Sequence, residues 1–97
     1  LSRKHWISFG GRPKGVVIID KGAEKALLEG GKSLLLPGIA QWEGNFKKNE
    51  IVVVCNEERQ EIARGIIAYS VGELHKIVDK KGKKEVIHRD DLVLCKR

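Results

Sequence analysis

Three histidines are the residues of this 97-residue chain best suited to acid–base chemistry. His5 stands near the N-terminus, and His75 falls on the solvated face of an expected helix. His88 is followed directly by Arg89, Asp90 and Asp91. Because a hydrolytic site needs a nucleophile, a base and an orienting acid that converge, the simpler interpretation of His88 is a strand-end residue bonded to a turn carboxylate. We therefore expect no catalytic residue in this chain.

Metal binding is also not expected from the carboxylates and cysteines. Asp90 and Asp91 could in principle hold Mg²⁺, but adjacent residues in an extended turn point apart, so the pair fits a turn better. Cys55 and Cys95 have no second Cys or His at the spacing of zinc ligands. Both cysteines lie at the ends of apolar runs, where Cys behaves as a small hydrophobic residue. The sequence leaves open whether a disulfide joins them.

Two segments could contact phosphate groups. The glycine-rich segment 10–15 leads into an apolar β-branched run, whereas a phosphate-cradling loop leads into the N-terminus of a helix. The segment 80–84 carries four lysines and no aromatic residue. It could contact phosphates, but a solvated loop that discourages edge-to-edge strand pairing is the better interpretation. Without an aromatic residue it offers no base-stacking platform.

The net charge of +6 is spread along the whole chain. Such a surface attracts polyanions such as RNA, but a Lys/Glu-rich surface is also common in proteins that need only solubility. Both interpretations stay open at this point. We expect a cytoplasmic protein without membrane association, because we find no signal peptide and no apolar stretch of the ~18 residues that span a bilayer.

The elements that must position these residues are short. The chain has the length of one domain, and with only five aromatic residues its core must be built from Val, Ile and Leu. About six strands and two short helices are expected, with turn residues every eight to twelve positions, which is typical of a small barrel or sandwich. Strands are expected at 16–19, 51–55, 85–88 and 92–95 and within 60–69. Residues 32–39 are expected to form a strand that runs into a Pro37-Gly38 turn, and 40–46 a strand end followed by a turn.

Local signals define the ends of both helices. Asp20 is expected to cap a helix over residues 22–29, and Gly30-Gly31 supplies a left-handed stop. Ser70 and Glu73 match a capping box that opens the second helix. Gly65 lies inside an expected strand, which indicates a bulge or the close approach of another backbone.

The order of these elements resembles a PUA domain. The resemblance is carried by the run 16–19, Asp20, Gly22-Ala23, Ala26-Leu27, Gly31-Lys32-Ser33-Leu34-Leu35 and Pro37-Gly38-Ile39. It implies a mainly β fold with two short helices, a pseudo-β-barrel of about six strands, over residues 15–97. Residues 1–14 are then a linker. PUA domains bind RNA around the first helix and the following strand, and the candidate nucleic-acid-binding residues of this region are Lys21, Lys25 and Lys32.

A narrower resemblance is to the C-terminal PUA domain of the glutamate 5-kinase family. The most specific part is the stretch Glu85-Val86-Ile87-His88-Arg89-Asp90-Asp91-Leu92-Val93-Leu94. This implies a parent enzyme of proline biosynthesis that phosphorylates glutamate with ATP and Mg²⁺ in an N-terminal amino-acid-kinase domain, and that forms a homo-oligomer. The chain itself would bind no cofactor and hold no catalytic residue. The start at Leu1, rather than Met, also suggests a fragment.

The sequence departs from that family at several points. Asn49-Glu50 stands where the family has Gly-Asp, Val71 replaces a second Ser, and the basic segment 80–84 replaces a helical segment. A surface built by that segment is therefore not expected here. The alternative interpretation is a stand-alone PUA module that binds structured RNA.

Overall fold

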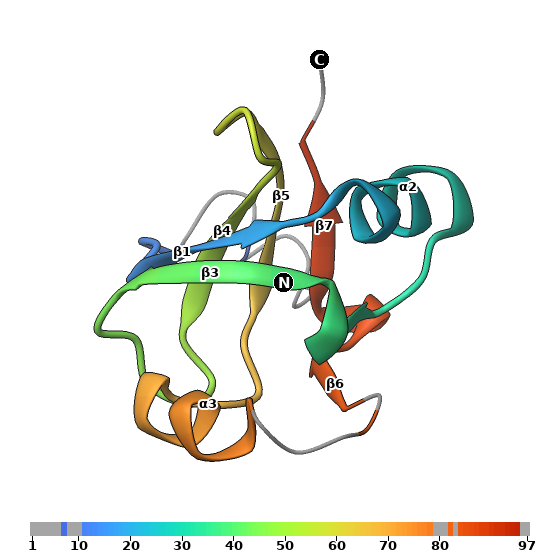
Figure 1. Ribbon diagram of the computed structural model, residues 1–97. Helices are drawn as coiled ribbons and strands as arrows, with labels where there is room; N and C mark the ends of the chain where they lie inside the picture. Colours follow the sequence, from blue (N-terminus) through green and yellow to red (C-terminus); the bar gives the residue numbers. More distant parts are fainter. Residues whose placement is uncertain (1–6, 8–10, 79–81, 83, 96–97) are drawn as a thin grey trace.

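Seven strands in two sheets form the framework of the computed structural model, which describes residues 7, 11–78, 82 and 84–95 (Figure 1). The larger sheet has the order β3-β1-β4-β5-β7, and the smaller one pairs β2 with β6. β1 and β4 are parallel, and all other pairs are antiparallel. The strands are β1 (Gly15–Ile19), β2 (Leu34–Leu35), β3 (Ile39–Gly44), β4 (Ile51–Cys55), β5 (Glu61–Ile66), β6 (Glu85–Ile87) and β7 (Leu92–Leu94). The mainly β class with two α-helices is confirmed.

The two β-branched runs lie in the middle of the larger sheet. β1 and β4 pair through Val16–Val53, Val17–Val54 and Ile18–Cys55. A strand buried on both faces is typically a continuous apolar run, and Val17, Val52 and Val54 are completely buried. Around them pack side chains from both sheets and both helices, with Phe46 as the one aromatic residue in the buried cluster of the described chain.

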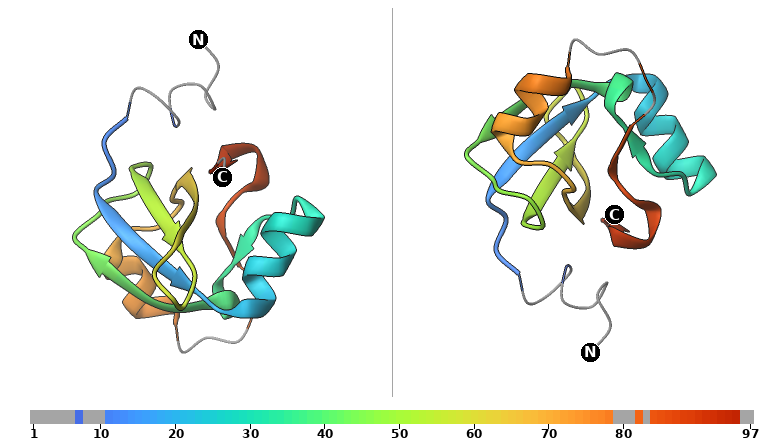
Figure 2. Two further views of the ribbon diagram at one scale, coloured as in Figure 1. Left: turned by 90° about the horizontal axis from the view of Figure 1, so that it is seen from above. Right: turned by 90° about the horizontal axis from the view of Figure 1, so that it is seen from below.

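Local signals predict both ends of the first helix and the start of the second, and the structure confirms them. In α2 (Lys21–Gly30), the Asp20 carboxylate accepts the Ala23 backbone N–H at 2.8 Å, and Gly31 ends the helix with φ of 58°. In α3 (Val71–Ile77), Ser70 and Glu73 form the reciprocal capping box. Each helix buries one leucine, Leu27 in α2 and Leu74 in α3. The two helices lie far apart at different corners of the barrel (Figure 2).

The strand expected at the start of 32–39 is only two residues long, and the Pro37-Gly38 turn expected after it is present. Only Leu34 and Leu35 pair with β6, and a 3-10 turn, η2 (Leu36–Gly38), follows. Pro37 cannot donate to a strand ladder and fixes its own φ. Gly38 packs against α2 so closely that an added Cβ would lie 2.6 Å from the Cβ of Ala23. The close approach of another backbone expected at Gly65 is confirmed, since an added Cβ there would lie 3.0 Å from the backbone oxygen of Asp91, as well as 2.6 Å from Ile87 Cγ2.

The segment before β1 also contributes to the packing. Ile7 is completely buried, so at least this residue of the expected linker is packed inside the domain. In the part of the chain that the structure describes, no helix is both long and apolar enough to cross a bilayer.

Candidate functional site

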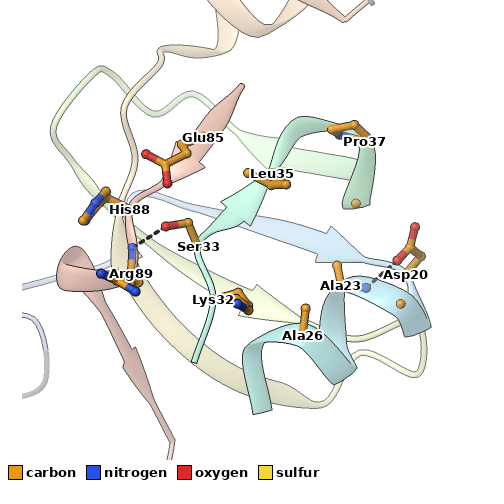
Figure 3. Close-up of a pocket in the computed structure, with 12 residues that line it drawn as sticks. Asp20, Ala23, Ala26, Lys32, Ser33, Leu35, Pro37, Glu85, His88 and Arg89 are labelled. Carbon is orange, nitrogen blue, oxygen red and sulfur yellow. Dashed lines mark hydrogen bonds between the residues drawn. The ribbon is translucent and has the colours of Figure 1, made fainter. Parts of the chain in front are cut away.

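A groove of about 640 Å³ lies between α2 on one side and β2, η2 and the end of β6 on the other (Figure 3). Its volume falls in the range of ligand-binding sites. Its lining combines an apolar floor with charged and polar side chains at the rim. The lining residues are Asp20, Gly22, Ala23, Ala26, Lys32, Ser33, Leu35, Pro37, Gly38, Glu85, His88 and Arg89.

Small and aliphatic residues build the apolar part of the groove. Ala23 and Ala26 are three residues apart on α2 and therefore share one helix face. Leu35 and Pro37 belong to the opposite wall, and Gly38 keeps that wall in contact with α2. The lining contains no Phe, Tyr or Trp, and the imidazole of His88 is its one aromatic ring.

The second 3-10 turn, η3 (Arg89–Asp91), brings residues distant in sequence to the groove. The Arg89 backbone N–H donates to Ser33 Oγ at 2.8 Å, across 56 residues of sequence. Figure 3 shows Lys32, Ser33 and Arg89 on the side of the groove away from Asp20. This hydrogen bond therefore holds the backbone of Arg89 beside Ser33, next to Lys32, and these three residues form a cationic rim. The Ser33 hydroxyl accepts in this bond and can still donate its own proton.

His88 also lies at this rim and caps η3. Its Nδ1 accepts the Asp90 backbone N–H at 3.1 Å and lies 3.6 Å from the Asp90 carboxylate. An imidazole nitrogen that accepts carries no proton, so the neutral ring in this arrangement has its proton on Nε2. The prediction of a strand-end residue in contact with a turn holds, but the hydrogen-bond partner is the backbone of Asp90.

The charges of the rim are not neutralised inside the domain. Among the described residues, Lys32, Glu85 and Arg89 are exposed, and their side chains have no hydrogen-bond or ion-pair partner. The Asp20 carboxylate, in contrast, is engaged as the cap of α2. Lys32 and Arg89 are therefore available to a ligand.

The predicted nucleic-acid-binding lysines divide into two groups. Lys32 lines the groove, whereas Lys21 and Lys25 are exposed on α2 and do not line it. Of the basic segment 80–84, Lys84 is exposed, and Lys80, Lys81 and Lys83 lie outside the described residues.

The other residues singled out for chemistry are not brought together. His75 is exposed, and its ring meets that of Trp42 edge-on, with 5.2 Å between the ring centroids. His5 lies outside the described residues. No group of three His, Cys, Asp or Glu side chains within the described ranges is placed to hold a metal ion.

The two cysteines are free thiols: Cys55 ends β4 and Cys95 directly follows β7, and β5 lies between these two strands. Cys95 Sγ donates to Glu61 Oε2 at 3.0 Å. Burial, with the nearby Glu61 carboxylate second, raises the pKa of Cys95 to about 11. Burial likewise raises the pKa of Cys55. Both are therefore protonated at neutral pH, and neither is an activated nucleophile.

Sequence reasoning missed most of the groove. Ser33, Leu35, Pro37 and Arg89 all stand in stretches that carried the family resemblance, but no role was assigned to them. One feature of the sequence could have indicated the groove: the stretches 31–39 and 85–94 each combine apolar and cationic residues. Only the β2–β6 pairing shows that they meet.

Comparison with known proteins assigns the fold to a family. The profile of the PUA domain matches residues 15–90. The chain belongs to the PUA domain family. A solved PUA domain from Aeropyrum pernix K1, in a tartrate complex, superposes with a TM-score of 0.71 at 30% identity, over 91% of this chain and 48% of that one.

The similar curated proteins are glutamate 5-kinases. That of Trichlorobacter lovleyi is 43% identical over 103 aligned positions, covering 95% of this chain and 27% of the relative. That of Caldanaerobacter subterraneus is 43% identical over 107 positions, covering 99% of this chain and 29% of the relative. This PUA domain is thus homologous to the C-terminal domain of glutamate 5-kinase and spans less than a third of those enzymes.

Proposed function

We propose that this chain serves as the C-terminal accessory domain of a glutamate 5-kinase, with a regulatory or structural role. The observation that carries the proposal is the extent of the similarity. Alignments to glutamate 5-kinases cover 95–99% of this chain but only 27–29% of the length of each enzyme. In this proposal the N-terminal amino-acid-kinase domain binds ATP and Mg²⁺ and phosphorylates glutamate in the cytoplasm. The PUA domain takes no part in the chemistry.

The groove and the thiols support this division of labour. The Cys95 thiol lies beside the Glu61 carboxylate, but its raised pKa keeps it protonated at neutral pH, so it is not an activated nucleophile. The exposed groups at the groove are suited to binding instead. A binding module attached to an enzyme can change the enzyme's affinities only by favouring one of its states.

The test compares the kinase with and without residues 15–97. The proposal expects the truncated enzyme to keep glutamate phosphorylation while its inhibition by proline, its Mg²⁺ dependence or its oligomeric state changes. Steady-state kinetics and analytical ultracentrifugation measure these properties. Unchanged values for all three would contradict an accessory role, and glutamate phosphorylation by the isolated 97-residue chain would contradict the division of labour.

RNA binding is the second candidate, and the lysines of the first helix favour it. Lys21, Lys25 and Lys32 are all exposed on or just after α2, in a chain of net charge +6. Charge-driven binding to structured RNA should weaken steeply as salt is raised. Replacing Lys25 and Lys32 with Glu should reduce the affinity strongly.

A matched control is available for the RNA experiment. Lys47 and Lys48 are exposed in the turn between β3 and β4, and replacing both with Glu changes the net charge by the same amount. Equal losses in the two double variants would indicate non-specific attraction. No binding at ~50 mM salt, where charge-driven contacts are strong, would exclude this candidate.

A further inference from the structure

We propose that the groove between α2 and the β2–β6 sheet docks an extended polypeptide segment in which an acidic residue stands beside aliphatic ones. The proposal rests on the groove alone and is independent of the attachment to a kinase. It names a partner of defined chemistry for the side chains that the domain leaves unpaired.

The floor of the groove selects for aliphatic side chains. Ala23, Ala26 and Leu35 are half-buried and, with the exposed Pro37, form a continuous non-aromatic surface. Recognition of single-stranded nucleic acid depends largely on stacking of bases against aromatic side chains, and apart from His88 at the rim the lining offers none. Leu, Val or Ile side chains would instead gain free energy by leaving water against this floor.

The cationic rim selects for a carboxylate. The Lys32 ammonium, the Ser33 hydroxyl and the Arg89 guanidinium lie on the same side of the groove (Figure 3). The hydrogen bond between the Arg89 backbone and Ser33 Oγ, at 2.8 Å, holds η3 against the start of β2. Hydrogen bonds from charged donors to a carboxylate are roughly twice as strong as those between neutral groups.

The two carboxylates of the lining distinguish a polypeptide from a polyphosphate. Glu85 lies on the cationic side, and Asp20 lies at the opposite end of the groove. Asp20 Oδ1 caps α2, so the acceptors that face a ligand are Glu85 and the other oxygen of Asp20. These repel phosphodiesters but can accept the backbone N–H groups of a peptide. The rim therefore offers donors and acceptors together, as an extended peptide requires.

The openness of the groove favours a segment over a small metabolite. None of its twelve lining residues is buried, whereas small-molecule sites usually enclose most of the ligand surface. A ligand in such a groove needs contacts at several points along its length. A volume of about 640 Å³ accommodates several residues in extended conformation.

The test is an amide NMR titration of the ¹⁵N-labelled 97-residue chain with three synthetic heptapeptides. The first has a central Glu between Leu and Val residues, the second has Gln in place of that Glu, and the third has Ser in place of the aliphatic residues. Shifts concentrated on residues 20–26, 32–38 and 85–89, saturable with the first peptide and clearly weaker with both others, would support the proposal.

Two double variants with equal charge changes sharpen the test. Lys32→Gln with Arg89→Gln removes the cations of the rim, and Lys21→Gln with Lys25→Gln removes two exposed cations of α2 that do not line the groove. The first pair should weaken binding by about tenfold, equivalent to one lost charge-assisted interaction, and the second pair should have little effect. Dispersed spectra of both variants establish that they fold.

Several results would overturn the proposal. These are no saturable shifts at millimolar peptide, equal binding of the Glu and Gln peptides, or equal losses in the two double variants. If free glutamate or another small aliphatic carboxylate gives the same shifts at the same concentration, the site recognises a metabolite and not a segment. If an RNA oligonucleotide displaces the peptide at lower concentration, the groove is a nucleic-acid site.

Discussion

The β4–β5 hairpin and the groove use their polar groups in opposite ways. In the hairpin, Asn56 is only 2% exposed and its side chain donates to Glu24 and Gln60 and accepts the backbone N–H groups of Glu58 and Gln60. In the groove, Lys32, Glu85 and Arg89 have no side-chain partner among the described residues. Polar groups in the hairpin thus stabilise the fold, whereas those in the groove are available to a partner.

The largest effect is expected where α2 is anchored to the core. Leu27 is 2% exposed and Leu28 is 45% exposed, although they are neighbours on the same helix. Leu27→Ala should lower the free energy of unfolding by about 2–5 kcal/mol, and Leu28→Ala by no more than about 0.5 kcal/mol. Urea denaturation measures both. Equal losses would mean that α2, and with it one groove wall, is not held as described.

The reactivity of Cys95 tests whether its thiol is protected in the folded chain. With a pKa of about 11 against an ordinary value of 9.0, Cys95 should react with iodoacetamide at pH 8 about a hundredfold more slowly in the folded chain than in urea, since the thiolate reacts. Mass spectrometry of the alkylated peptide measures the rate. Similar alkylation rates in the folded and unfolded chain would show that folding does not raise the pKa of Cys95.

The same shift has a consequence for stability. The folded state holds the Cys95 proton more tightly than the unfolded state, so this contribution is fully present below about pH 9 and is lost as the pH rises towards 11. The wild-type chain should therefore lose stability relative to Cys95→Ser over that range.

A smaller loss is expected from the hairpin. Asn56→Ala should lower the free energy of unfolding by about 1–3 kcal/mol, because it removes the hydrogen bonds that this buried side chain makes to Glu24, Glu58 and Gln60. Asn45→Ala is the matched control, since Asn45 is exposed between β3 and β4. If the two substitutions cost the same, the hydrogen bonds of Asn56 do not stabilise the hairpin.

The smallest effect on stability is expected in the groove. Lys32→Gln combined with Arg89→Gln should change the free energy of unfolding by less than about 0.5 kcal/mol, because exposed substitutions that break no contact are close to neutral. Thermal unfolding followed by circular dichroism measures this. A loss similar to that of Asn56→Ala would show that the rim supports the fold, and the contrast between the two regions would disappear.

The sequence predicted the features that depend on near neighbours. The Asp20 cap, the Gly31 stop and the capping box of Ser70 with Glu73 each involve residues within a few positions, so their chemistry can be recognised without the fold. The block 85–94 was recognised by resemblance, and the homology to glutamate 5-kinase is confirmed.

The groove could not be predicted because it depends on contacts between distant residues. Arg89 reaches the rim only through its hydrogen bond to Ser33, 56 residues earlier. The apolar wall requires residues 36–38 to leave the strand and turn against Ala23. The Pro37-Gly38 turn is readable from the sequence, but its contact with the helix is not. Lys21, Lys25 and Lys32 were grouped by sequence, but only Lys32 lines the groove.

In the function proposed for this domain, the groove side acts and the sheet supports it. The most direct measurement uses an enzyme of the proposed kind, a glutamate 5-kinase that contains this domain, and compares the proline inhibition and Mg²⁺ dependence of its Lys32→Gln, Arg89→Gln variant with those of the intact and truncated enzymes. We predict that the double variant reproduces the change caused by removing the domain, while Lys21→Gln with Lys25→Gln does not. Truncation that alters the kinetics while the groove variant behaves as the intact enzyme would contradict it.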